Sequence, residues 1–201
     1  AYQEVIRQFY EAGCRNLQFD DCVWGGMVDA KMATALTGRN GQALEDYKKR
    51  LLKLNNQVVA QAPEDLVINT HVCRGNYHST FFSSGAYDSV ADLLFGEENV
   101  NAYYLEYDDK RSGGFAPLAK VSGDKKVVLG LITTKIPQLE EKGKVIARIH
   151  EAEKYVPLDR LYLSPQCGFA SCEIGNKLTE EEQWEKLKLV KEIAEEVWGD
   201  R

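Results

Sequence analysis

The sequence predicts an α/β fold built on a parallel sheet. Five short apolar segments alternate with segments whose apolar residues recur at helical spacing. Parallel neighbouring strands need a crossover connection, usually a helix, so this alternation favours a parallel sheet. The chain has only five prolines in 201 residues, and no linker-like segment divides it. We therefore expect one domain over residues 1–201.

The expected helices and strands follow one another along the chain. The helix in VIRQFYEAGC ends at Gly13, a residue type that terminates helices, and the strand NLQFDD follows. A helix around residues 44–60 precedes the strand DLVINTHVC, and a helix around residues 88–95 precedes the strand VNAYYLEYDD. KVVLGLITT is the fourth strand, IPQLEEKGKVIARIHEAEKYV contains a helix, and RLYLSPQCG is the fifth strand. The closing helix begins after Thr179, which has capping-box spacing to Glu182.

Composition and charge restrict the class of function. The net charge of −6 is spread over the helical segments and leaves no basic face for phosphates, so nucleic acid is not an expected partner. No apolar run approaches the roughly 18 to 20 residues of a membrane span, and no secretory signal pattern is recognisable. Five cysteines, an odd number, favour reduced thiols over a disulfide scaffold. We expect a cytoplasmic protein with neither a membrane nor a nucleic acid as partner.

Residues that can bind a metal stand at the ends of several expected strands. The carboxyl ends of parallel strands meet on one face of the sheet, where α/β folds place their sites. His71 and Cys73 lie two positions apart, so strand alternation points both to the same side. Zinc prefers thiolate and imidazole ligands, accepts carboxylate oxygen, and binds four of them tetrahedrally. The sequence therefore predicts a zinc ion held by His71, Cys73, Glu106 and Cys167.

Each of these residues also has a structural alternative. A histidine or cysteine at a strand end is often only packed, and Cys167 could be a buried structural thiol. Glu106 could form a salt bridge with Arg74 or Arg111 instead of binding a metal. The remaining cysteines have no partner at zinc-finger spacing, and we do not expect them to bind the metal: Cys14, Cys22 and Cys172.

Five segments carry a family pattern: LQFDD at 17–21, THVC at 70–73, YLEY at 104–107, LGL at 129–131 and SPQCG at 164–168. Together they resemble the catalytic barrel of cobalamin-independent methionine synthase and, more closely, its short single-barrel bacterial relatives. The resemblance implies a (β/α)8 TIM barrel of the methionine synthase/uroporphyrinogen decarboxylase type, with zinc at its carboxyl-end face. The five strands resemble the last five of that barrel. We expect the three earlier strands in residues that precede this sequence.

The same resemblance implies a zinc-dependent methyltransferase of methionine biosynthesis, similar to 5-methyltetrahydropteroyltriglutamate–homocysteine S-methyltransferase. Zinc in this family lowers the pKa of an acceptor thiol, such as that of homocysteine, so that a thiolate attacks a methyl group. The family's methyl donor is a methylated folate. An aspartate that matches Asp20 holds the acceptor's amino group, which makes Asp20 a candidate substrate-binding residue, as is Arg74 below. Asp20 could instead cap a helix, but Asp21 could do so equally well.

Departures from the family pattern bear on the methyl donor. Asp21 and Cys22 stand where the family has glutamate and proline, and Arg74 follows Cys73 where the family carries a second cysteine. A family histidine that helps to protonate the folate matches Lys135, the candidate catalytic residue. A lysine is normally charged at neutral pH and donates a proton poorly. Arg74 and Lys135 could instead bind an anionic group of another donor or acceptor, or be ordinary surface charges.

The residues leave two other functions open. One is a metal-dependent hydrolase or lyase in which zinc activates water, although two thiolate ligands would reduce the Lewis acidity of the metal. The other is a non-catalytic relative that binds a thiol or a metal. The segment 74–85, RGNYHSTFFSSG, is a candidate lid because it is long and rich in glycine and aromatic residues. We expect His78 to belong to this loop rather than to the site.

Overall fold

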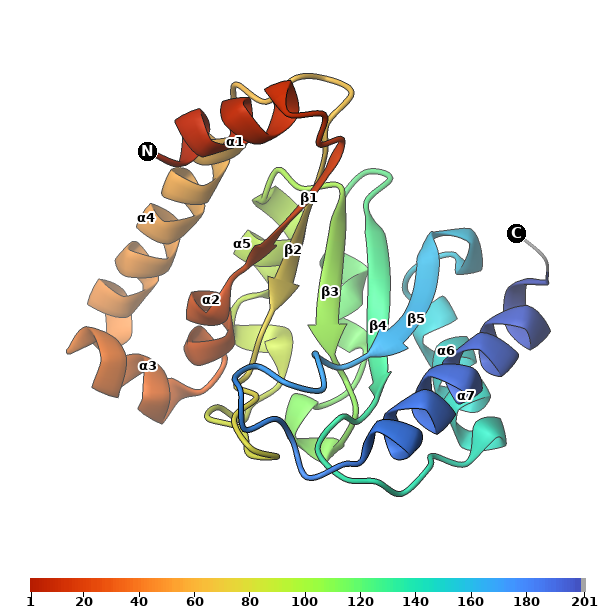
Figure 1. Cartoon of the computed structure of the whole chain (residues 1–201). Coiled ribbons are helices and arrows are strands. Elements are labelled where there is room, and N and C mark those ends of the chain that lie inside the picture. Colours follow the sequence, from red (N-terminus) through yellow and green to blue (C-terminus); the bar gives the residue numbers. More distant parts are fainter. Residues whose placement is uncertain (200–201) are drawn as a thin grey trace.

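The computed structural model describes residues 1–199, in which a five-stranded parallel sheet carries α-helices between consecutive strands except β3 and β4 (Figure 1). Two short 3-10 helices, Lys110–Ser112 and Ala116–Lys120, connect those two strands. The strands are β1 (Asn16–Asp20), β2 (Val67–Val72), β3 (Ala102–Glu106), β4 (Lys126–Ile132) and β5 (Leu161–Pro165). The α-helices are α1 (Tyr2–Glu11), α2 (Cys22–Met27), α3 (Ala30–Thr37), α4 (Gly41–Val59), α5 (Ala91–Glu97), α6 (Lys142–Glu153) and α7 (Glu180–Trp198).

The strands lie in the order β1-β2-β3-β4-β5, and every neighbouring pair is parallel. The predicted α/β class and the parallel sheet are therefore confirmed. Each new strand is added on the same side of the preceding one, so the strand order never reverses within the described residues. Figure 1 shows α4 near the β1 edge of the sheet and α7 near the β5 edge. None of the helices over residues 1–199 is both long and apolar enough to cross a membrane.

Two short helices between β1 and α4 were not predicted. Asp21 caps α2 by accepting hydrogen bonds from the backbone N–H groups of Val23 and Trp24. Asp29 caps α3 in the same way, and α3 ends at Gly38, whose φ of 64° suits glycine. These helices are too short to show a clear apolar period, and two adjacent glycines in α2 weaken its helix signal further.

The core is densest around the three central strands. All residues of β4 except Lys126 are buried, and β2 is buried except at Val67. In contrast, β1 alternates between exposed and half-buried residues, because it lies at one edge of the sheet. A register shift between Gly130 and Ile132 offsets β4 from β5. A Cβ atom on Gly130 would lie 2.7 Å from the Gln166 Cα atom, so glycine allows the chain after β5 to approach β4.

A buried carboxyl, Glu98, gives the fold a pH-dependent stability. Burial raises the pKa of Glu98 from 4.5 to about 7. Between these values the unfolded chain has released the proton that the folded chain still holds, so this group lowers stability progressively as pH rises. The loss is complete above pH 7 and amounts to about 3 kcal/mol.

Glu98→Gln should therefore be more stable than the original chain at alkaline pH, and this advantage should shrink as the pH falls from about 7 to about 4.5. Urea denaturation at about pH 4.5 and about pH 8.5 measures both differences. A difference in unfolding free energy that stays constant between the two pH values would contradict the assignment.

Candidate metal centre

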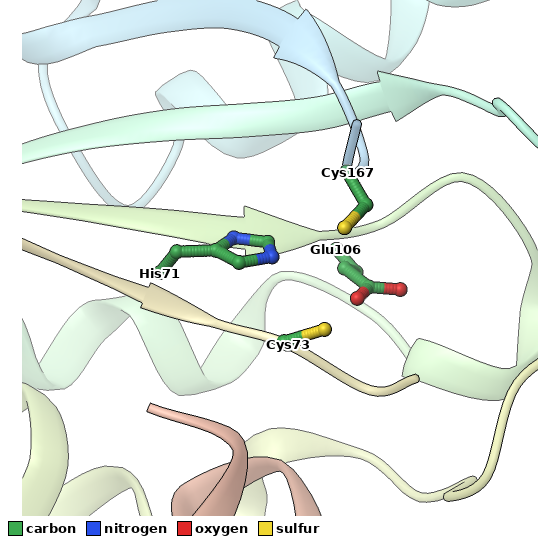
Figure 2. A group of neighbouring side chains, drawn as sticks. All are labelled: His71, Cys73, Glu106 and Cys167. Atoms are coloured by element: carbon green, nitrogen blue, oxygen red, sulfur yellow. The ribbon is translucent and has the colours of Figure 1, made fainter. Parts of the chain in front are cut away.

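The four expected metal ligands converge at the carboxyl ends of the strands. One ligand atom from each of His71, Cys73, Glu106 and Cys167 lies within 4.8 Å of the others. His71 lies on β2 and Cys73 directly follows it, whereas Glu106 ends β3 and Cys167 follows β5. Figure 2 shows the four side chains directed toward one another from these three strands. Parallel pairing produces this meeting, because it aligns the carboxyl ends of strands that are distant in sequence.

The donor atoms of this cluster suit zinc. The His71 Nε2 atom is buried without a hydrogen-bond partner among the described residues, and the nearest carboxylate oxygen, of Asp20, is 4.0 Å away. A buried nitrogen of this kind is costly unless it binds something. Two sulfur atoms, one imidazole nitrogen and one carboxylate oxygen form a set that zinc accepts in tetrahedral geometry. The residues present therefore fit a zinc ion.

The two thiols of the cluster are coupled. A hydrogen bond from Cys73 lowers the pKa of Cys167, and the same bond, together with burial, raises the pKa of Cys73 well above its usual range. Burial opposes protonation of His71, but the neighbouring Cys73 and the nearby acidic groups outweigh burial and raise the pKa of His71. The groups of the cluster therefore titrate as one coupled set, and a bound cation would favour their deprotonated forms.

Glu106 is fully buried and held on both oxygens. Its Oε1 atom accepts a hydrogen bond of 2.7 Å from the backbone N–H of Arg74, and its Oε2 atom accepts one of 2.9 Å from Arg111. Burial raises the pKa of Glu106, while these contacts oppose the rise. The expected salt-bridge alternative is thus present with Arg111. It does not exclude metal binding, since each carboxylate oxygen has a second lone pair.

Arg111 links Glu106 to a wider ionic network. The same Nη2 atom contacts Asp108 at 2.8 Å, and Nη1 contacts Asp109 at 2.5 Å. The side chains of Arg111 and Asp108 are 5% and 1% exposed, so their pairing is shielded from water. From the sequence, Arg111 was expected only as an alternative partner of Glu106. Its closeness in sequence to three carboxylates was the signal for this larger role.

Arg74 is not a surface charge. Its side chain is fully buried, donates to the Gly85 carbonyl and the Tyr87 hydroxyl, and stacks 4.2 Å from the centre of the Tyr87 ring. The surface-charge alternative for this residue is therefore wrong. Arg74 instead joins the two ends of the loop 74–85, and only its backbone N–H contacts a candidate ligand.

Lys135 is also buried, at 7% exposed, so the surface-charge alternative is wrong here too. Its ammonium donates to the Gly75 carbonyl at 3.0 Å and to Asn76 Oδ1 at 2.9 Å. Burial lowers the pKa of Lys135, and the nearby Glu106 carboxylate opposes this shift. The side chain therefore lies next to the cluster, but two of its donors are already bound to the loop.

The candidate lid, residues 74–85, is tied to the chain that follows Cys167. Asn76 Nδ2 donates to the Gly168 carbonyl at 2.7 Å, and Asn176 Nδ2 donates to Asn76 Oδ1 at 2.9 Å. His78 Nδ1 lies 3.1 Å from the Gly175 carbonyl, outside the ligand cluster, as expected. The loops that follow two of the candidate ligands are thus bound to each other.

Asp20 and Cys22 flank the cluster on the β1 side. The Asp20 side chain is 64% exposed, which leaves it accessible to a substrate. One ligand atom from each of Asp20, Cys22 and Cys73 also lies within 4.8 Å of the others. Burial and the neighbouring Cys73 raise the pKa of Cys22 to about 12. Cys22 was not an expected ligand because it lacks a partner at zinc-finger spacing, yet its position just after β1 places it at the same end of the sheet.

Gly25 sets the position of Cys73. A Cβ atom at Gly25 would lie 1.9 Å from the Cys73 carbonyl oxygen, so no larger residue fits without moving the ligand. Gly25→Ala should lower the free energy of unfolding by at least roughly 1–3 kcal/mol and weaken zinc binding. Urea denaturation and zinc titration measure these effects.

Gly143→Ala, in α6, is the matched control, because a Cβ atom there meets nothing within 4 Å. Its stability should stay within about 1 kcal/mol of the original chain. Equal stability and equal zinc affinity of the Gly25 variant would contradict the proposed close packing.

Fold and site together define an α/β protein with a buried cluster of ligand-type residues at the carboxyl end of a parallel sheet. Residues 1–196 match the family described as the cobalamin-independent synthase catalytic domain. The chain therefore belongs to the cobalamin-independent methionine synthase family, as the sequence motifs indicated.

Three relatives illustrate this membership. The Bacillus subtilis protein YxjG, which is uncharacterised, is 47% identical over 199 residues, covering 98% of this chain and 52% of that protein. A 5-methyltetrahydropteroyltriglutamate–homocysteine methyltransferase of Acidithiobacillus ferrooxidans is 24% identical over 168 residues, covering 84% of this chain and 19% of that enzyme.

The third relative is a crystal structure from Listeria monocytogenes, of a protein proposed as a vitamin-B12 independent methionine synthase. It matches with a TM-score of 0.76 and 40% identity, covering 100% of this chain and 54% of that one. The chain thus spans about half the length of its more similar relatives.

Proposed function

We propose that this chain forms part of a zinc-dependent methyltransferase that activates a thiol, homocysteine or a close analogue, for methyl transfer. One observation carries the proposal: four ligand-type side chains lie within 4.8 Å of one another, and the His71 nitrogen among them has no partner in the described structure. The two sulfur donors favour thiol chemistry over hydrolysis, because thiolates reduce the Lewis acidity that activation of water requires. Family membership and the named Acidithiobacillus relative support the same reaction class.

Zinc, when bound, would lower the pKa of the substrate thiol so that a thiolate is available at neutral pH. His71, Cys73, Glu106 and Cys167 would hold the ion. The Arg111 guanidinium and the Arg74 backbone N–H fix the Glu106 carboxylate in the orientation that faces the cluster.

The surrounding residues would orient the substrate. The exposed Asp20 carboxylate lies 4.0 Å from His71, which places it to accept the ammonium group of an amino-acid acceptor. We assign Lys135 and Arg74 positioning roles, because both hold the loop that follows Cys73. A methylated folate remains one candidate donor. Two of the three Lys135 donors are bound to neutral oxygens of the loop, which leaves one donor and the positive charge for an anionic group.

We further propose that residues 1–201 belong to one catalytic domain whose sheet is part of a (β/α)8 barrel. The unreversed order of five parallel strands suits a barrel, since doubly wound sheets reverse their strand order. Both edge strands, β1 and β5, are paired on one side only within residues 1–199. Five free cysteines, two of them candidate zinc ligands, favour a reducing compartment such as the cytoplasm.

Incubation of the zinc-loaded protein with homocysteine and several methyl donors, including methylated folates, tests the proposal by measuring methionine. Asp20→Asn should keep its zinc but raise the KM for homocysteine by at least about tenfold, because the ammonium group loses its counter-charge. An unchanged KM would remove Asp20 from the acceptor site. Bound zinc without methionine from any donor would instead support a non-catalytic relative that binds thiols.

A further inference from the structure

A cavity of about 300 Å³ lies between α4 and the strands β1 and β2, on the side of the molecule that α4 covers in Figure 1. None of the four candidate zinc ligands lines it. A cavity of this size falls at the lower end of the range of small-molecule sites. Asp20 and Cys22 do line it, so the cavity adjoins the β1 side of the cluster, and it has room for one small ligand.

Most of the cavity wall is apolar. Phe19 of β1 faces Leu51, Val58 and Val59 of α4 across it, and Val100 adds to the wall. These side chains are at most half-exposed and offer no hydrogen-bonding group. The wall therefore suits an apolar ligand body rather than a hydrated metal ion.

Two carboxyls face this apolar space without a cationic partner. Asn55 Nδ2 donates to Asp21 Oδ2 and to Glu98 Oε1, each at 2.7 Å, and Trp24 Nε1 lies 3.3 Å from the same Glu98 oxygen. Glu98 is 2% exposed, and its Oε2 atom has no hydrogen-bond partner among residues 1–199. Neither carboxyl forms a salt bridge within the described chain. Glu98 Oε2 is thus a buried hydrogen-bond acceptor without a donor among the described residues.

A second polar atom at the same cavity is also unpartnered. Thr70 is 2% exposed and lines the cavity, and its Oγ1 atom lacks a partner within the described structure. The Lys125 charge acts on Glu98, but its Nζ atom donates to Ser122 Oγ at 2.8 Å and forms no salt bridge with Glu98 among the described residues. A ligand that donates several hydrogen bonds and carries a positive charge would satisfy both orphaned oxygens.

We propose that this cavity is a binding site for a small organic ammonium compound with an apolar body. The ammonium would donate to Glu98 Oε2 and to Thr70 Oγ1, and the body would lie between Phe19 and the valines of α4. Buried carboxylates are costly unless they are paired, so the charge supplies selectivity for cations over neutral molecules of the same shape. None of the four candidate zinc ligands takes part, although Asp20 of the proposed acceptor site also lines the cavity.

The test compares benzylammonium with benzyl alcohol, which has nearly the same shape but no charge. Calorimetric titration of the folded chain at about pH 8 keeps most Glu98 ionised, since burial raises its pKa to about 7. Benzylammonium should bind at least about tenfold more tightly than benzyl alcohol. It should also shift the NMR signal of the Trp24 indole N–H, which contacts Glu98. Equal binding of the two probes, no binding, or an unmoved Trp24 signal would overturn the proposal.

Three variants locate the site. Glu98→Gln should remove the preference for benzylammonium, whereas Glu97→Gln, which changes an exposed neighbour, should leave it intact. Val58→Phe keeps both carboxyls but fills the cavity, so it should lower the binding affinity of both probes. This last variant decides the matter if Glu98→Gln fails to fold. Tight binding of benzylammonium to a folded Val58→Phe chain would show that the cavity is not the site.

Discussion

Replacing Cys73 by serine is expected to abolish tight zinc binding. A serine hydroxyl stays protonated at neutral pH and cannot replace a thiolate, so the site would lose one of its two sulfur donors. Cys73 also lies next to both His71 and Cys167, so its removal disturbs the centre of the cluster. Zinc affinity should fall by at least about 100-fold, and methionine formation should fall with it. Zinc content after gel filtration and competition with a chromophoric chelator measure the loss.

Cys172→Ser is the matched control. It makes the same chemical change at an exposed cysteine that is not part of the ligand cluster. Zinc content and affinity should be those of the original chain. A folded Cys73→Ser protein that retains one tightly bound zinc ion would show that Cys73 is not a ligand.

Arg111→Leu is expected to destabilise the fold more than any change to a surface ion pair. Removing the guanidinium leaves Glu106 and Asp108 buried without their counter-charge. Loss of one partner from a buried ion pair typically costs about 3–5 kcal/mol. The variant should also bind zinc differently, because the Glu106 carboxylate loses the contact that orients its Oε2 atom. Urea denaturation with and without zinc separates the two effects.

Arg7→Leu is the control for this change. Arg7 pairs with Glu4 and Glu11 on the surface of α1, and all three side chains are more than half exposed. Such pairs contribute at most about 1 kcal/mol, so this variant should be nearly as stable as the original chain. Similar losses for the two arginine variants would contradict the importance assigned to the Glu106 network.

The β-strands were the most predictable part of the fold. Continuous apolar runs such as that of β4 fit central strands buried on both faces, and the helices between them fit parallel pairing. The short helices α2 and α3 escaped prediction because their caps, Asp21 and Asp29, resemble ordinary turn residues. In the sheet, Asp20 of β1 is the register partner of His71 of β2. The sequence indicated that both residues lie at strand ends, but the choice of neighbouring strands depends on the tertiary structure.

The site was predictable in its donor atoms and less so in its surroundings. Strand-end position sufficed to bring the four candidate ligands together. It did not indicate that Arg74 and Lys135 are buried and bound to the loop, because both are charged residues in a polar segment. Burial of a long cationic side chain depends on hydrogen-bond partners that are far away in sequence or belong to the backbone. No local sequence pattern indicates such partners.

X-ray absorption at the zinc edge, with and without homocysteine, tests whether this site binds the thiol of the acceptor to zinc. We expect two sulfur neighbours of zinc in the protein alone, from Cys73 and Cys167, and three after homocysteine is added. A calorimetric titration run in parallel establishes that homocysteine has bound. Two sulfur neighbours in both states, with homocysteine bound, would contradict thiol activation by this site.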